Sequence, residues 1–105
     1  MRQPQLINIF MYLYAIHDSS TGYIKLGYSN NPEKRMKSLQ TGNSSVLQLI
    51  HCAEVSSDRA RVLEQQLHRE LKHLQVRNEW FSLDKTQAQQ MIDYIIIRYE
   101  DDILI

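Results

Sequence analysis

Apolar positions along the chain recur at every second residue in some stretches and at every third or fourth in others, which predicts alternating strands and helices. Mostly β-branched, aromatic and aliphatic residues occupy 9–16, the turn formers HDSSTG follow, and YIKLGYS resumes the extended pattern. These stretches predict a β-hairpin with a loop of about five or six residues. The imperfect alternation over 45–55 predicts a third strand of the same sheet.

Capping signals mark the ends of two helices. Asn31 and Pro32 suit the cap and the first position of a short helix, and Gly42 suits its end. Asp84 is a suitable cap for a last helix over about 85–100.

A longer helix is predicted between them, with Ser57 or Asp58 as its cap. Apolar residues at spacings of three to five predict its buried stripe: Val62, Leu63, Leu67, Leu71 and Leu74. The last helix has a core side of its own: Ala88, Met91, Ile92, Ile95, Ile96 and Tyr99. Between these two helices, EWFSL is a short apolar element.

Together the elements predict one small α/β domain of the α+β type over residues 1–105. We expect a three-stranded, mainly antiparallel sheet with about three helices around it. A chain of 105 residues is long enough for a single modest core.

Composition changes this picture little. The 43% hydrophobic and 23% charged residues are typical of soluble globular proteins, and no run reaches the ~18 apolar residues of a membrane span. The single cysteine, Cys52, excludes an internal disulfide and favours a reducing, cytoplasmic setting, where we expect it to be a small buried apolar group.

Charge is balanced overall and uneven along the chain. Twelve basic and twelve acidic residues cancel, which argues against a protein that coats nucleic acid by bulk attraction. Residues 1–82 hold ten basic and seven acidic side chains, and residues 83–105 hold two and five, so the acidity lies in the tail.

Candidate chemistry begins with Lys25, Gly27 and Arg35. A glycine in a strand often marks a close approach of another group, and a lysine with an arginine nearby suits a phosphate. A solvated lysine, a bulge glycine and an exposed arginine would give the same pattern, so this segment alone leaves both interpretations open.

Glu64 and His68 are four residues apart on the longer helix and therefore share a face. They would approach one ligand together, form an ordinary surface pair, or make a buried hydrogen bond. His51, His73 and Cys52 could be combined with His68 as zinc ligands, but no close CxxC or HxxxH pair supports zinc.

Taken in order, these motifs resemble the GIY-YIG nuclease superfamily, in particular its short phage- and bacteria-associated branch in which lysine replaces the tyrosine of the second motif. LYAI at 13–16 resembles the first motif and KLG at 25–27 the second, and Gly27 stands thirteen positions after Tyr14. LEQQLHREL and NEWFSL resemble the glutamate segment and the closing element. The resemblance covers about 11–83.

The resemblance implies hydrolysis of DNA phosphodiesters with one divalent cation, Mg²⁺ or Mn²⁺. The matching positions make Glu64 the metal ligand and Arg35 the cation that neutralises the phosphoryl oxygens. Tyr14 is the first candidate for the base, although Lys25, Arg35 or the metal would have to lower the pKa of its phenol. Lys25 and His68 are the alternatives.

Further residues are assigned to the substrate. Gly27, Lys34 and Asn78 are expected at the DNA-binding site. Trp80 and Phe81 would stack on a base or pack in the core, with core packing the preferred interpretation.

Two functions follow: a metal-dependent DNA endonuclease or nickase, or a non-catalytic nucleic-acid-binding or protein-interaction module with the same fold. Lys25 in the second motif and the missing glycine of the first motif favour the latter. DNA is the expected partner, without a membrane, and a homodimer or another protein would supply specificity. The apolar end, 103–105, is a candidate contact for such a dimer, and Glu79 is expected to act as a cap or pair with Arg77.

Overall fold

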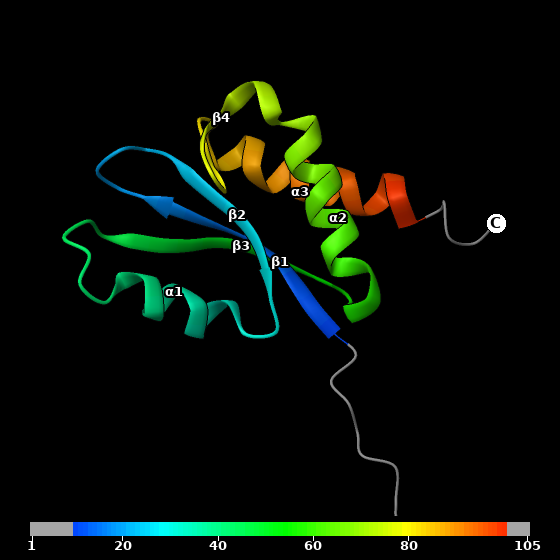
Figure 1. Cartoon of the computed structure of the whole chain (residues 1–105), viewed down its shortest axis with the longest axis horizontal. Coiled ribbons are helices and arrows are strands. Elements are labelled where there is room, and N and C mark those ends of the chain that lie inside the picture. The colour runs from blue at the N-terminus through cyan, green and yellow to red at the C-terminus, as the bar shows by residue number, and fades with distance from the viewer. Residues whose placement is uncertain (1–9, 101–105) are drawn as a thin grey trace, which may run out of the picture.

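The computed structural model describes residues 10–100, which form an antiparallel sheet and three α-helices (Figure 1). The predicted α+β class is confirmed. The strands are β1 (Phe10–Asp18), β2 (Ile24–Ser29), β3 (Leu47–Ser56), β4 (Gln75–Arg77) and β5 (Trp80–Phe81). The helices are α1 (Pro32–Gln40), α2 (Ser57–Glu70) and α3 (Lys85–Glu100), with a short 3-10 helix, η1 (Lys72–Leu74), after α2.

The sheet has five strands in the order β3-β1-β2-β5-β4, not the three that the sequence predicts. The two additional strands, β4 and β5, hold three and two residues, which is too short for a periodic pattern to show. The hairpin of β1 and β2 is confirmed, and its register places Tyr14 opposite Gly27.

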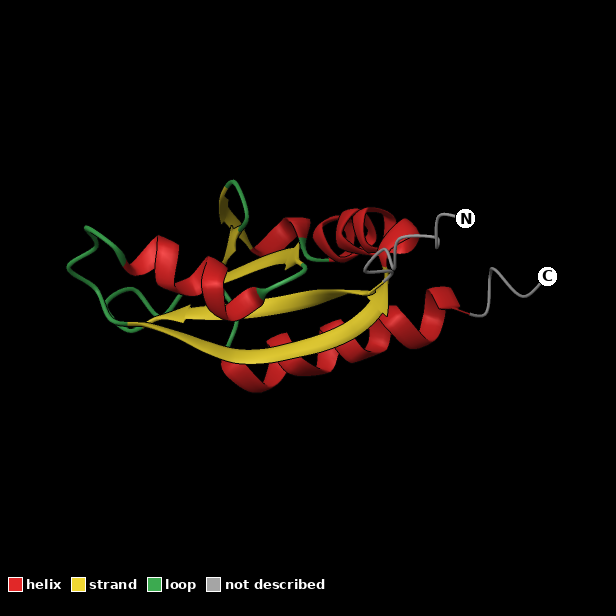
Figure 2. Ribbon diagram, turned by 90° about the horizontal axis from the view of Figure 1, so that it is seen from below, coloured by secondary structure: helices red, strands yellow, loops and turns green. Residues whose placement is uncertain are grey.

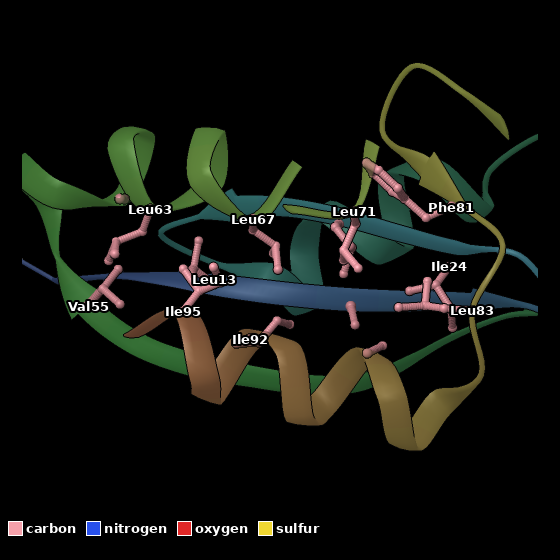
Figure 3. Close-up of a cluster of buried hydrophobic side chains, with 14 residues drawn as sticks. Leu13, Ile24, Val55, Leu63, Leu67, Leu71, Phe81, Leu83, Ile92 and Ile95 are labelled. Atoms are coloured by element: carbon pink, nitrogen blue, oxygen red, sulfur yellow. The ribbon is translucent and has the colours of Figure 1, made fainter. Parts of the chain in front are cut away.

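The two faces of the sheet pack against different helices (Figure 2). Leu13 and Ala15 of β1 belong to the larger core, in which leucines of α2 and isoleucines of α3 meet (Figure 3). Tyr14 and Ile16 point to the other face, where they pack with residues of α1. Tyr14 is therefore on the face that α1 covers.

Local capping follows the sequence at α1 and α3. The Oδ1 atom of Asn31 accepts a hydrogen bond from the backbone N–H of Lys34 at 3.1 Å, and α1 ends just before Gly42, whose φ is +75°. At α3, Asp84 and Gln87 each accept a hydrogen bond from the other's backbone N–H, as in a capping box.

Three expectations on packing and capping are wrong. The N-cap of α2 is Ser56, not Ser57 or Asp58, and it makes no side-chain cap bond. Val62 is 52% exposed because the buried positions of α2 are Ala60, Leu63 and Leu67, which lie on a different side of the helix. Cys52 is exposed because the residues of β3 that pack in the cluster beneath α1 are Leu47 and Leu49.

The predicted contacts at 103–105 and the start of the first strand at residue 9 lie outside the described residues. Within residues 10–100, no helix is long and apolar enough to cross a lipid bilayer.

Candidate active site

A cleft of about 450 Å³ lies along the edge of β2. β5 pairs only with Ile24 and Lys25, so it leaves the rest of this edge without a neighbouring strand. Side chains from β1, β2, α1, α2 and the β4–β5 turn meet here, and the lining includes Tyr14, Tyr28, Ser29, Arg35, Glu64 and Glu79.

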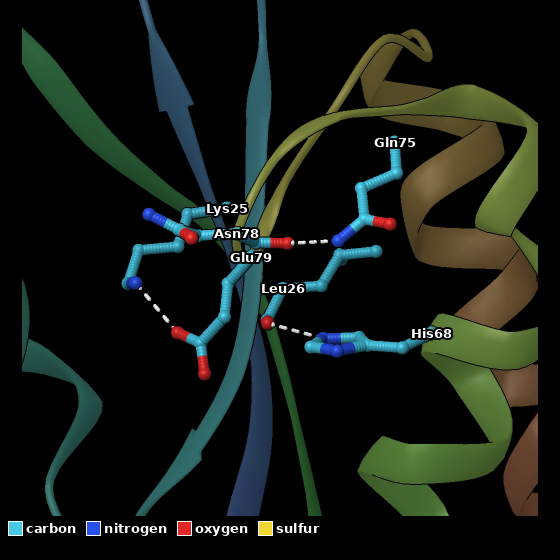
Figure 4. Close-up of polar contacts among 6 residues, drawn as sticks. All are labelled: Lys25, Leu26, His68, Gln75, Asn78 and Glu79. Carbon is cyan, nitrogen blue, oxygen red and sulfur yellow. Dashed lines mark hydrogen bonds and ion pairs between the residues drawn. The ribbon is translucent and has the colours of Figure 1, made fainter.

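Helix α2 and the β4–β5 turn satisfy the backbone groups of the open edge (Figure 4). The N–H of Leu26 donates to the carbonyl of Glu79 at 2.9 Å, and the carbonyl of Leu26 accepts from Nε2 of His68 at 2.8 Å. Two residues along the strand, Tyr28 provides a backbone hydrogen bond to the Glu64 carboxylate. Leu26 and Tyr28 are about 6.6 Å apart along the strand, and Glu64 and His68 are about 6 Å apart along the helix axis. The spacing of the two helix residues therefore matches that of their two partners on β2.

His68 supports the site and is not among the residues that line the cleft. A carbonyl oxygen can only accept, so Nε2 of His68 carries the proton and is not available as a base. Its ring packs 5.0 Å from the ring of Phe81. The geometry therefore gives His68 the task of fixing α2, and with it Glu64, against β2.

The carboxylate of Glu64 has a raised pKa. Burial is the main cause and repulsion by Glu79 the second, while His68, Lys25 and the backbone of Tyr28 act in the opposite direction. Two carboxylates that repel each other in one cleft are suitable oxygen donors for a hard divalent cation. Within residues 10–100 no group of three or more His, Cys, Asp or Glu side chains could hold a metal, so an Mg²⁺ or Mn²⁺ ion here would complete its shell with water and substrate oxygens.

The phenol of Tyr14 does not have the lowered pKa that a base would need. Burial and the charge of Glu79 raise it to about 12, Arg35 offsets only part of this, and Glu64 adds to it. Tyr14 is 2% exposed and lies directly over Gly27, where an added Cβ would be 2.6 Å from the phenolic oxygen. The close approach predicted at Gly27 is thus made by Tyr14.

Lys25 and Glu79 form an ion pair with 2.6 Å between Nζ and Oε2 (Figure 4). The Glu79 carboxylate therefore occupies the side-chain nitrogen of Lys25 in this arrangement. The partner of Glu79 is therefore Lys25, and not Arg77 as the sequence suggested. Sequence reasoning missed Glu79 as a cleft residue, although its place in NEWFSL was an available signal.

The two remaining predicted site residues differ in their positions. Lys34 lines a hollow of about 290 Å³ at the start of α1, and Arg35 lines both this hollow and the cleft. Asn78 is exposed in the β4–β5 turn with φ 52°, and its carbonyl accepts from Nε2 of Gln75 at 2.6 Å. Asn78 shapes the turn that carries Glu79 and does not line the cleft.

Because Tyr14 is buried, the stability of the folded protein should depend on pH in the alkaline range. The pKa of its phenol in the folded protein, about 12, lies above the ordinary value of 10.0, so its contribution to stability is complete below pH ~10 and is lost as the pH rises toward 12. A shift of this size corresponds to roughly 3 kcal/mol. We expect Tyr14→Phe to lose less stability than the parent over this range in urea titrations. Equal losses would contradict the burial of an intact phenol.

The fold and the cleft define a class of small α+β domain in which a guanidinium, a phenol and two carboxylates from separate elements meet at an open strand edge. The chain belongs to the T5orf172 domain family, whose sequence model matches residues 10–96 and so includes the whole cleft. No curated protein and no solved structure matches the chain. The family description states no activity, and the likeness to GIY-YIG nucleases stays a prediction.

Proposed function

We propose that this T5orf172 domain is a divalent-metal-dependent DNA endonuclease or nickase of the GIY-YIG type. One observation carries the proposal: Tyr14, Arg35 and Glu64, matched to nuclease motifs far apart in the sequence, line a single cleft. Glu79 adds a second carboxylate to that cleft.

The chain's own residues supply distinct functions. Arg35 binds the scissile phosphate and neutralises the charge that develops on its oxygens. Glu64 and Glu79 are the residues that would hold Mg²⁺ or Mn²⁺, and the ion would supply activation of a water and polarisation of the phosphate. Tyr14 keeps its proton at neutral pH and donates a hydrogen bond to a phosphate oxygen or to the water. Lys25 orients Glu79 through the ion pair.

Plasmid cleavage in Mg²⁺ or Mn²⁺ tests this function. We expect conversion of supercoiled plasmid to nicked or linear forms, and none with EDTA. Arg35→Ala should slow cleavage by about a hundredfold, the loss typical of removing one donor to a developing anion. Arg61→Ala is the matched control, because Arg61 is exposed on α2 and does not line the cleft.

Cleavage that is equally fast in Arg35→Ala would sink the catalytic assignment. If the parent does not cut, the non-catalytic alternative applies, and a salt titration separates its two forms. DNA binding should weaken with salt at a slope of about 0.9 per neutralised phosphate, whereas a flat response would favour a protein partner.

A further inference from the structure

A second hollow, of about 440 Å³, lies near the start of β2, whereas the cleft includes residues at its end. Three segments far apart in the sequence meet there: the β1–β2 loop with Tyr23, the α1–β3 loop with Asn43, and the β4–β5 hairpin with Arg77 and Trp80. Its volume is within the range of ~300–1,000 Å³ for small-ligand sites.

The hollow combines two partly exposed aromatic rings with a cation. Tyr23 and Trp80 are each half-buried, so their rings are incompletely covered by the protein, whereas Phe81 beside them is fully buried. Arg77 is exposed, and neither salt bridge among residues 10–100 includes it. Aromatic side chains with a nearby arginine are the usual platform for unpaired nucleobases.

Asp18 distinguishes between a base and a phosphate as the occupant. Its Oδ1 accepts hydrogen bonds from the backbone N–H and the hydroxyl of Ser20, at 2.9 and 2.8 Å, which fixes the carboxylate in the turn beside the hollow. A fixed anion repels phosphate but accepts from the exocyclic amino group of a base. The side-chain oxygen of Asn43 accepts a hydrogen bond from the backbone N–H of Ser45 at 2.9 Å. This bond orients the side-chain amide of Asn43, which also lines the hollow.

The hollow is connected to the cleft through one chain of contacts. Nζ of Lys25 lies 5.9 Å from the centroid of the Trp80 ring and 2.6 Å from Oε2 of Glu79. Trp80 lines the hollow and Glu79 lines the cleft. β2 runs from the hollow to the cleft, and its six residues span about 16 Å at ~3.3 Å per residue. A strand whose phosphate lies at Arg35 would thus reach the hollow along β2.

From these contacts we infer that the hollow is a nucleobase-binding subsite, which takes one unpaired base of the strand held in the cleft by stacking on Trp80 and Tyr23. This inference rests on the proposed function for its DNA substrate. Arg77 binds the flanking phosphate at the rim, and Asp18 and Asn43 contact the edge of the base. The subsite predicts a preference for single-stranded or locally unpaired DNA.

Trp80 is the single tryptophan of the chain, so its fluorescence reports directly on this hollow. The full chain, in EDTA to prevent cleavage, is titrated with a short single-stranded DNA and with an abasic strand of equal length. We expect quenching by the DNA and at least about fivefold weaker binding of the abasic strand, the lower end for one stacked base. Tyr23→Ala should weaken DNA binding by a similar factor without affecting the abasic strand. Tyr94→Ala, at an exposed tyrosine of α3, is the matched control.

Equal affinity for both strands, or an unchanged affinity in Tyr23→Ala, overturns the subsite. Plasmid cleavage by the same preparation separates this result from the proposed function. Cleavage without any base-dependent quenching refutes the subsite alone. Base-dependent quenching without cleavage retains the subsite and refutes the nuclease.

Discussion

Glu64→Gln is expected to lower cleavage by at least about a thousandfold and, at the same time, to stabilise the fold. The glutamine keeps an oxygen for the backbone of Tyr28 but loses the charge that holds Mg²⁺ or Mn²⁺, and a thousandfold corresponds to ~4 kcal/mol of transition-state stabilisation. Stability should rise because the ionised carboxylate of Glu64 is both partly buried and repelled by Glu79. Cleavage rates and thermal unfolding in EDTA measure the two effects.

The sign of the pH dependence provides an additional check. A folded pKa above the unfolded value means that Glu64 costs stability when ionised and recovers it as the pH falls through the folded pKa. The difference in melting temperature between Glu64→Gln and the parent should therefore be largest at neutral pH and shrink in acid.

Glu79→Gln is the matched comparison, because it leaves Lys25, whose side chain is 14% exposed, without its carboxylate and should destabilise the fold. Wild-type cleavage by Glu64→Gln, or a fall in its stability in EDTA, would refute the roles given to Glu64.

Gly27→Ala is expected to cost both stability and activity. The new Cβ would lie 2.6 Å from the oxygen and 2.7 Å from the Cζ atom of Tyr14, which is 2% exposed and cannot move outward without leaving its core. Overpacking of this kind typically costs about 1–3 kcal/mol, and misplacing a positioned group by about 1 Å costs roughly a hundredfold in rate. Urea unfolding and plasmid cleavage provide the two measurements.

Two variants define the cause. Gly42→Ala has open space around the added Cβ but φ +75°, so it should lose stability through backbone strain and keep cleavage. Tyr14→Ala removes the group that the new Cβ would meet, so Gly27→Ala should cost less stability in a Tyr14→Ala background than in the parent. A Gly27→Ala protein as stable and active as the parent would show that Tyr14 is not fixed over Gly27.

Local sequence determined most of the individual elements. The caps at Asn31 and Asp84, the turn after β1 and the stripe of α3 depend on residues within a few positions of one another, so their pattern is visible in the chain. The spacing of Tyr14 and Gly27 suits the predicted hairpin, whose register places the two residues opposite each other.

The charge states and partners at the cleft were decided by the tertiary structure alone. The sequence placed Arg35 and Glu64 among the site residues, but it assigned Glu79 to Arg77 and left His68 and Lys25 open as bases. Two-residue β5 has no periodic signal, yet its shortness leaves the edge of β2 open to His68 and brings Glu79 to Lys25. Burial and long-range charge, which raise the pKa of Tyr14, depend on groups that are distant in sequence and adjacent only once the chain has folded.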